Sequence, residues 1–337
     1  MPLRFKQILI FSPDTPTGGP EALHQLADVL NSMGAVARMV YIGEFSTLVP
    51  EGDTLTCTVS EDAPARVTYR EYNAPPLLSA KLTSDTLLIF PEIWIDFAVD
   101  CINRTSAQIS IWWLSVDNSP LFYRERNYDF ENLLFRHRLL HFYQSHYALH
   151  MLLERGATNL APLFDFTSRA FVRKGLGDLT HSKDQRTYSI AYFPNKAGAK
   201  AVEFLESLAA RNPGVSLVAI KNMSKAEVAE TLWKTKIFID FGHSPGKDRM
   251  PREAAALGLV VFVRKVGAAR FSNDYPIGED YFFSDADLDN YSLEQRVLAV
   301  LSFTEQSIEA QAVMRNRVAL EYEEFALQVR QSFFKSP

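Results

Sequence analysis

The segment from residue 236 to 263 restricts the possible folds of this chain more than any other. An apolar run that includes Ile237, Phe238 and Ile239 predicts a buried strand. The chain then passes through a loop rich in glycine and charge into a short helix, with Pro251 near its first turn, where a missing N–H costs nothing. A second apolar run, residues 259–263, follows at once. This order of strand, loop, helix and strand predicts an α/β unit with a parallel sheet.

Strand-like and helix-like segments alternate in this way in two successive series. The first series runs from the strand-like segment at residues 7–12 to another at 160–164, and the second begins at 188–193. Residues 167–187 are rich in glycine and charge and lack periodicity, which indicates a linker. We therefore expect two α/β domains and a C-terminal helix, spanning residues 1–166, 188–315 and 316–337.

Two details of the first series are predicted from local pattern. The helix after the first strand is expected to begin at Pro20 and to end at Gly34, in the usual C-terminal position of a glycine. Residues 54–60 and 65–72 alternate polar and apolar side chains on either side of a polar, proline-containing turn. That alternation predicts an inserted β-hairpin.

Composition excludes several classes of protein. The chain has 337 residues and a formal net charge of −5, which argues against nucleic acid as the main partner. No apolar run reaches transmembrane length, and the run at residues 7–11 is too short for the core of a signal peptide. Two cysteines, Cys57 and Cys101, form no metal or redox motif. A cytoplasmic location is the simplest interpretation.

Charged residues around the short helix of the opening segment suit an anionic ligand. The free N–H groups at a helix start favour an anion, and Lys247 and Arg249 stand beside them. Arg252 is expected to form a salt bridge or to face solvent. The Glu253 carboxylate is placed to accept both hydroxyls of a ribose, with a role in complementing the helix dipole as the alternative. His243, in the loop, is a candidate for contact with a nucleotide or sugar.

Further candidates follow predicted strands. Lys196 comes directly after the first strand of the second series, so it is expected at the carboxyl edge of the sheet, where open α/β sheets bind ligands. Gly18 and Gly19 follow the first strand of the chain and allow close approach of backbone to a phosphate. Asp117 and, in competition with it, Glu92 are candidate general bases, with a capping or turn role as the alternative for both.

The string Gly-His-x-Pro-Gly-Lys-Asp-Arg-x-Pro-Arg-Glu-Ala-Ala, residues 242–255, resembles the nucleotide-sugar half of GT-B glycosyltransferases, in particular those of bacterial surface polysaccharides. The resemblance implies that Glu253 binds the ribose hydroxyls, that Lys196 contacts donor phosphate and that the loop of Asn222 contacts the nucleobase. Gly18 and Gly19 resemble the Gly-Gly-x-Glu loop of the same enzymes. Pro245 stands where many retaining members carry a glutamate, so no contact to the donor sugar is carried over.

This resemblance implies a fold of two Rossmann-like domains facing a cleft, with a last helix that packs back on the first domain. The implied activity is metal-independent transfer of a hexose from a nucleotide-diphosphate sugar to a glycan or lipid-linked acceptor in surface polysaccharide synthesis, with no further cofactor. Two alternatives remain open. One is a nucleotide-sugar epimerase or hydrolase on the same fold, and the other is a non-catalytic subunit that binds a nucleotide sugar.

Three further patterns favour simpler explanations. Residues 242–248 approach a phosphate-binding P-loop but are one residue short and have Asp248 where a serine or threonine would bind magnesium. Asp285, Asp287 and Asp289 alternate but lack the glycine and glutamate of a calcium loop. Residues 121–143 mix aromatic and basic side chains with acidic ones, which favours a packed helical region over a membrane surface. Peripheral contact with the inner face of a membrane stays open.

Overall fold

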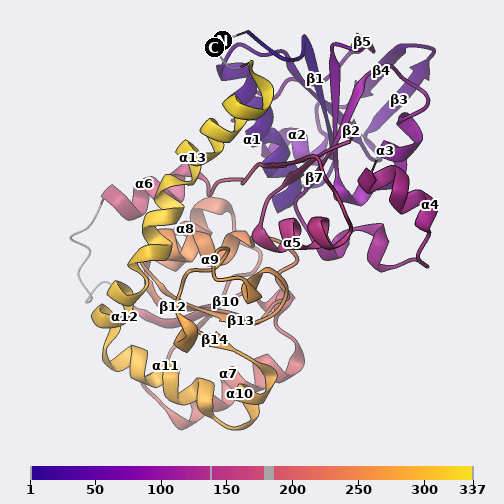
Figure 1. Cartoon of the computed structure of the whole chain (residues 1–337). Helices are drawn as coiled ribbons and strands as arrows, with labels where there is room; N and C mark the ends of the chain where they lie inside the picture. The colour runs from indigo at the N-terminus through magenta and orange to yellow at the C-terminus, as the bar shows by residue number, and fades with distance from the viewer. Residues whose placement is uncertain (1, 137–138, 178–185, 336–337) are drawn as a thin grey trace. The chain divides into compact units, whose positions relative to one another are not determined.

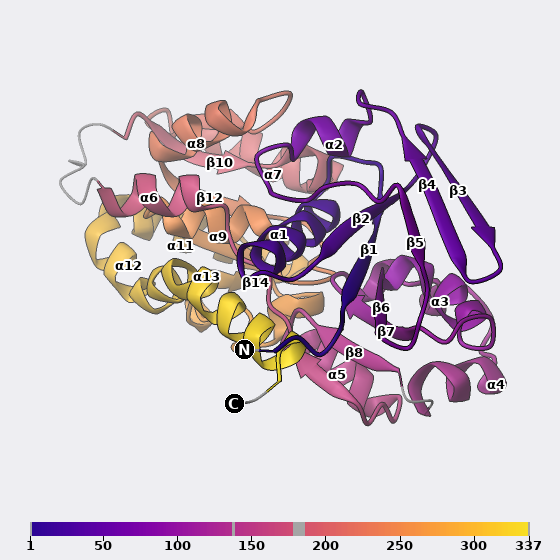
Figure 2. The same ribbon diagram turned by 90° about the horizontal axis from the view of Figure 1, so that it is seen from above.

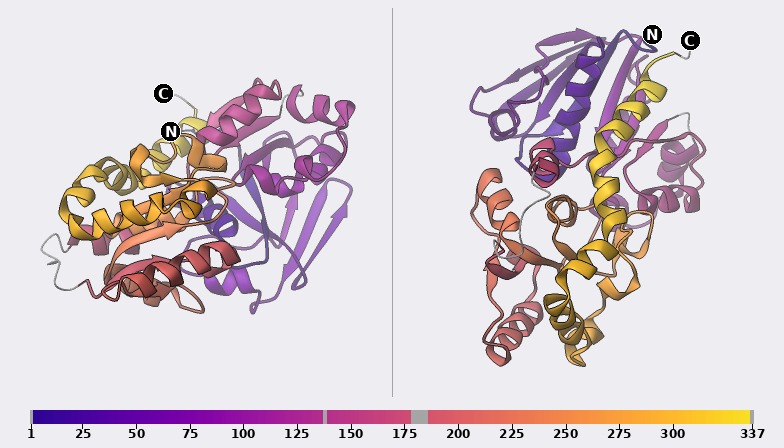
Figure 3. Two further views of the ribbon diagram at one scale, coloured as in Figure 1. Left: turned by 90° about the horizontal axis from the view of Figure 1, so that it is seen from below. Right: turned by 90° about the vertical axis from the view of Figure 1, so that its left-hand side faces the viewer.

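The computed structural model describes residues 2–136, 139–177 and 186–335 (Figure 1). The chain forms two compact units, one of Met1–Asp165 with Tyr322–Pro337 and one of Phe166–Glu321. Helix α13 (Ala312–Phe333) begins in the second unit and ends in the first, and Figure 3 shows it as one continuous helix.

Among its described residues, the first unit has a six-stranded parallel sheet in the order β2-β1-β6-β7-β8-β9. Its strands are β1 (Gln7–Pro13), β2 (Ala37–Ile42), β6 (Thr86–Pro91), β7 (Gln108–Trp113), β8 (Leu140–Tyr143) and β9 (Leu160–Pro162). Its α-helices include α1 (Gly18–Ser32), α2 (Pro64–Thr68), α3 (Ile95–Cys101), α4 (Tyr128–Glu131) and α5 (His146–Glu154). Helix α1 lies against β1 and β2 (Figure 2).

Strand β7 ends in a continuous apolar run, and its packing on both faces shows why. A central strand of a parallel sheet is covered on both faces, so both sets of side chains are buried. Trp112 and Trp113 are fully buried. The Trp112 ring stacks on Phe325 of α13, with centroids 6.2 Å apart, while the Trp113 ring N–H donates to His141 Nδ1 at 3.1 Å. Successive side chains of this strand therefore serve opposite faces of the sheet.

The last part of α13 belongs to the first unit through side-chain contacts. Phe333 stacks on Phe142 of β8, with ring centroids 5.3 Å apart. The Gln328 side chain accepts the backbone N–H of Phe164 at 2.8 Å. Both ends of the chain lie side by side, because the backbone N–H of Arg4 donates to the Phe333 carbonyl at 3.0 Å (Figure 1).

The predicted hairpin at residues 54–72 is wrong in its second arm. Strand β4 (Thr54–Val59) pairs antiparallel with the preceding β3 (Ser46–Glu51) and with β5 (Ser79–Lys81). Gly52, at φ +57°, supplies the turn between β3 and β4, since glycine adopts this conformation without strain. The following segment instead forms helix α2 (Pro64–Thr68), because a proline at the first helical position favours a helix start.

The described residues of the second unit contain a five-stranded parallel sheet in the order β11-β10-β12-β13-β14. Its strands are β10 (Tyr188–Tyr192), β11 (Leu217–Ala219), β12 (Thr235–Asp240), β13 (Val260–Arg264) and β14 (Phe282–Phe283). Its helices are α6 (Arg169–Gly177), α7 (Ala199–Arg211), α8 (Lys225–Trp233), α9 (Arg249–Ala256), α10 (Asp285–Asp289), α11 (Ser292–Ser302) and α12 (Thr304–Ala310).

The linker expected at residues 167–187 is wrong for its first half. Residues 169–177 form α6, which packs on α9, and Gly175 lies so close to the Ala256 carbonyl that an added Cβ would be 1.9 Å from its oxygen. Residues 178–185 of the expected linker lie outside the described part of the chain. In the described ranges, no helix is both long and apolar enough to cross a membrane.

Candidate functional site

The strand order of the second unit defines where a ligand is expected. From β10 the chain goes to β11 on one side of the sheet and then to β12 on the other, so the connections diverge between β10 and β12. Open α/β sheets bind ligands at such a point, beyond the carboxyl ends of the strands. Lys196 lies four residues after β10, and Asp240 is the last residue of β12. The structure therefore places Lys196 at this edge of the sheet.

Lys196 lies beside two carboxylates, Asp240 and Asp248, that the sequence did not mark as site residues. Its Nζ is 2.5 Å from Oδ2 of Asp248, the residue that precedes α9. Asp240 is buried; its Oδ1 accepts the Gly242 N–H at 2.9 Å, and its Oδ2 has no hydrogen-bond partner among the described residues. The Lys196 side chain keeps 36% of its exposure, so it remains accessible to a ligand.

Burial dominates the protonation of these carboxylates. Loss of solvation raises the pKa of Asp240, against the opposing effects of Lys196 and the Gly242 N–H. The same effect raises the pKa of Asp248 to about 6. For Lys196, burial acts to lower the pKa, but the negative fields of Asp248 and Asp240 together outweigh it and raise the pKa. Lys196 is therefore a cation at neutral pH, held by acids that take up a proton readily.

Two glycines allow the loop between β12 and α9 to take this shape. A Cβ on Gly242 would lie 2.7 Å from Cδ of Lys196, so glycine leaves the space through which the lysine stem passes. Gly267 has φ +57°, and a Cβ there would lie 2.0 Å from the Ser244 carbonyl oxygen. The same carbonyl accepts the Ala268 N–H at 2.7 Å. The segment after β13, residues 267–270, therefore packs against this loop and fixes its backbone through the bond to Ser244.

Glu321 is the second feature that the sequence analysis missed. This buried carboxylate accepts hydrogen bonds from the Thr167 backbone N–H and hydroxyl, each at 2.8 Å, and from Nη1 of Arg252 at 3.0 Å. Lys247 Nζ lies 3.3 Å from its other oxygen. The Arg252 guanidinium also donates to the carbonyls of Lys247 and Asp248. Arg252 therefore forms a salt bridge, one of its two expected roles, and Lys247 pairs with the same carboxylate of Glu321.

The remaining candidates of this unit lie along α9 and the nearby loops. Arg249 Nη2 is 3.2 Å from Glu253 Oε1, an ion pair one helical turn apart, and Glu253 is buried. His243 is exposed in the loop. Asn222 is exposed after β11 and has φ +56°, a left-handed conformation that asparagine tolerates better than most residues. Among the described residues, no group of three or more His, Cys, Asp or Glu side chains is placed to hold a metal ion.

The candidates of the first unit gather at the carboxyl edge of its own sheet. Gly18 and Gly19 are the first residues of α1, two residues earlier than expected, after β1. A Cβ on Gly19 would meet one atom within 4 Å, Cδ1 of Leu114 at 3.9 Å, so packing does not require glycine there. Glu92 follows β6, and its Oε2 accepts the Leu114 N–H at 2.9 Å. Asp117 follows β7 and accepts the Tyr147 hydroxyl at 2.5 Å.

Glu92 and Asp117 differ in exposure and in protonation. Glu92 is 3% exposed, and burial raises its pKa to about 7, although the N–H groups of Leu114 and Ser115 oppose the shift. Asp117 is partly exposed and accepts the Tyr147 hydroxyl. Glu92 therefore ties two adjacent strand ends together, whereas Asp117 is partly accessible from solvent.

Replacing Glu321 by glutamine is expected to destabilise the second unit by about 3–5 kcal/mol, because two buried cations lose their counter-charge. Urea denaturation of Glu321→Gln beside wild type measures the change. Glu323→Gln is the matched control, since Glu323 is exposed on the same helix. Equal stability of Glu321→Gln and the control would contradict this role for the carboxylate.

Glu92→Gln is expected to remove a pH dependence of stability. The folded pKa of Glu92 is about 7, above the ordinary 4.5, so its contribution is full below pH 4.5 and is lost as pH rises through 7. Wild-type stability minus that of the variant should fall by up to about 3 kcal/mol over this window. Denaturation at a series of pH values measures the difference, and a difference that rises or stays flat with pH would refute it.

The comparisons with known proteins identify the fold. No family model matches the sequence, and neither does a curated protein. Solved structures do match over 97% of this chain: a glycosyltransferase from Rickettsia africae ESF-5 (11% identity, TM-score 0.64, 96% of that chain), HepE from Anabaena (10%, 0.60, 98%) and TarM of S. aureus (9%, 0.63, 99%). The likeness confirms the expected fold class, two Rossmann-like domains of the GT-B type with a C-terminal helix.

Proposed function

We propose that the protein is a glycosyltransferase that transfers a sugar from a nucleotide-diphosphate sugar to a glycan or lipid-linked acceptor. The observation that carries the proposal is the position of Lys196, a partly exposed cation at the point where the strand connections diverge, facing the start of α9. Diphosphates bind at such sheet edges and helix starts because N–H groups and cations converge there.

Structures that share this fold contain nucleotides and sugars. HepE was solved in complex with UDP-glucose, the pneumococcal enzyme GtfA with UDP and GlcNAc, and TarM with UDP. These contents support a nucleotide-sugar donor for the present chain.

In the proposed complex the donor diphosphate takes the place of Asp248 at Lys196. When the bond from the anomeric carbon to the diphosphate breaks, its electron pair stays on the diphosphate, and a fixed cation stabilises the growing charge. Asp248, with a pKa of about 6, can take up a proton as the diphosphate enters, which reduces repulsion between the two anions. Lys247 remains a predicted phosphate contact, but its pairing with Glu321 places Lys196 ahead of it.

Glu253 is proposed to bind the ribose hydroxyls from α9, exchanging its bond with Arg249 for the ligand. Arg249 is proposed to contact the diphosphate. His243 and Asn222, both exposed, are proposed to contact the sugar and the base. Gly18 and Gly19 of the first unit are proposed to lie against an acceptor or donor phosphate.

For the chemical step we place Asp117 ahead of Glu92. As the acceptor oxygen attacks the anomeric carbon, its proton must pass to a base if configuration is inverted. Asp117 is the more exposed carboxylate, while Glu92 is buried and bonded to backbone N–H groups. If configuration is retained, the mechanism needs no such base and Asp117 positions the acceptor hydroxyl.

The donor site is tested by the thermal stability of the protein with UDP-, GDP-, dTDP-, CDP- and ADP-linked sugars. A ligand that binds only the folded state raises the melting temperature by mass action. We expect a rise with one nucleotide series, and its loss or reduction in Glu253→Gln, since an amide is a weaker acceptor for two ribose hydroxyls.

Glu206→Gln is the control, because Glu206 is an exposed glutamate on a different helix, α7. Where a donor binds, chromatography of the products separates the candidate functions. Sugar joined to an acceptor supports transfer, whereas free or isomerised sugar alone indicates a hydrolase or an epimerase. The absence of any shift in folded protein would refute the donor site.

A further inference from the structure

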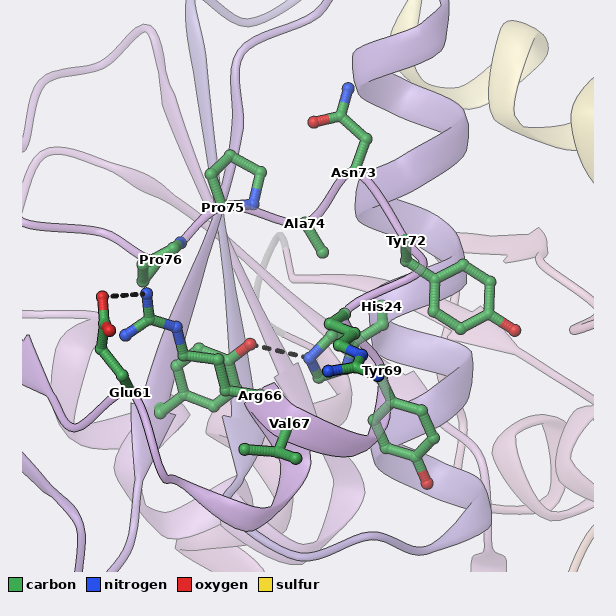
Figure 4. Close-up of a pocket in the computed structure, with 12 residues that line it drawn as sticks. His24, Glu61, Arg66, Val67, Tyr69, Tyr72, Asn73, Ala74, Pro75 and Pro76 are labelled. Carbon is green, nitrogen blue, oxygen red and sulfur yellow. Dashed lines mark hydrogen bonds and ion pairs between the residues drawn. The ribbon is translucent and has the colours of Figure 1, made fainter. Parts of the chain in front are cut away.

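A cavity lies within the first unit, apart from its candidate base. It has a volume of about 460 Å³ and lies among α1, β2, α2 and the segment of residues 69–76 (Figure 4). Cavities of about 300–1,000 Å³ hold small-molecule ligands. In Figure 4, Glu61 and Arg66 stand on one side of the cavity and Tyr69 and Tyr72 on the other.

The walls of this cavity are held by specific hydrogen bonds. The Tyr69 hydroxyl donates to the Thr17 carbonyl and the Tyr72 hydroxyl to Oε1 of Glu21, each at 2.8 Å, which fixes the segment along the start of α1. Further along, the Pro75 carbonyl accepts the backbone N–H of Met39 on β2 at 2.9 Å. The cavity is therefore formed before a ligand arrives, which lowers the entropic cost of binding.

The floor of the cavity is polar but uncharged. His24 Nδ1 lies 2.6 Å from the Pro20 carbonyl, which can only accept, so this nitrogen carries the hydrogen. His24 Nε2 then accepts the Tyr41 hydroxyl at 2.8 Å. Burial lowers the pKa of His24 to about 4, so the ring is neutral near pH 7. The charge of the cavity is consequently set by the side chains at its rim.

Two arginines dominate that rim. Arg70 is exposed and has no hydrogen-bond or ion-pair partner among the described residues. Arg66 pairs with Glu61 at 3.6 Å, but the Glu61 side chain is 91% exposed, and such solvent-screened pairs contribute little. The side-chain amide of Asn73, also at the rim, has no partner in the part of the chain that the structure describes. Two cations and an amide are thus available to a ligand.

We propose that this cavity binds a phosphate-bearing sugar or polyol, with the phosphate at Arg66 and Arg70. Guanidinium groups bind phosphate through paired N–H bonds. Two guanidinium groups balance the double charge of a phosphate better than they balance the single charge of a carboxylate. Asn73 supplies an amide for ring or chain hydroxyls, and Val67, Pro75 and Pro76 line the cavity with apolar surface for carbon. If the proposed function holds, this ligand is the acceptor; that assignment of its role rests on the proposed function.

The test is calorimetric titration of glucose 1-phosphate, glycerol 3-phosphate and uncharged glucose into wild type and Arg70→Met. We expect both phosphates to bind to wild type and glucose to bind more weakly than either. In Arg70→Met the affinity for the phosphates should fall about tenfold, because one charge-assisted contact is lost. Arg104→Met is the matched control, since Arg104 is an exposed arginine of the same unit outside the cavity. Lys196→Met should retain binding, because Lys196 belongs to the other unit.

Sedimentation with vesicles of phosphatidylglycerol or phosphatidylcholine separates a lipid-borne polyol phosphate from a free one. Binding of either form that depends on Arg70 supports the proposal. Absence of binding in every arm, or an equal loss in Arg70→Met and Arg104→Met, overturns it. Donor titrations on the same variants keep the two claims apart: Arg70-dependent phosphate binding without donor binding would leave the cavity standing and refute the glycosyltransferase.

Discussion

The buried carboxylate of Glu321 is the interaction on which the candidate donor site depends. Glu321 accepts hydrogen bonds from Thr167 and Arg252 and lies beside Lys247. Thr167 and Glu321 lie at the two ends of the second unit, so this one acid connects both ends to the start of α9. A buried acid of this kind is stable only while its partners are present. The loop that carries Lys247 and the start of α9 that carries Arg252 therefore have little freedom, whereas the Lys196 side chain remains partly exposed.

The regular part of the fold was predictable because its signals are local. The predicted order of strand, loop, helix and strand at residues 236–263 is present as β12, α9 and β13, and α1 follows β1 as expected. The errors occurred where two local patterns compete. Alternation at residues 65–72 suggested a strand, but the proline start of α2 prevailed, and the charged stretch at 169–177 is helical because α6 packs on α9.

The candidate site was predictable in position but not in its electrostatics. Lys196 could be placed at the sheet edge because it directly follows a strand whose apolar pattern is unambiguous. Its partner Asp248 and the buried Glu321 carry no local signal, since each is an ordinary acid in the sequence and gains its role from residues far along the chain. The cavity that Arg66 and Arg70 line was not predicted for a different reason: the sequence pattern at residues 65–72 indicated a strand instead of helix α2. In the proposed transfer a fixed cation stabilises the diphosphate as it leaves, and Lys196 is a partly exposed cation at the edge of the sheet where such a ligand is expected.

The central claim is that Lys196 binds the donor diphosphate. Calorimetric titration of the nucleoside diphosphate, monophosphate and free nucleoside of the preferred base tests it directly, in wild type, Lys196→Met and the exposed control Lys200→Met. The account predicts that Lys196→Met lowers the affinity for the diphosphate by at least about tenfold and the affinity for the monophosphate by less. The affinity for the nucleoside should not change. Equal weakening of all three ligands, or no change in any, would contradict it.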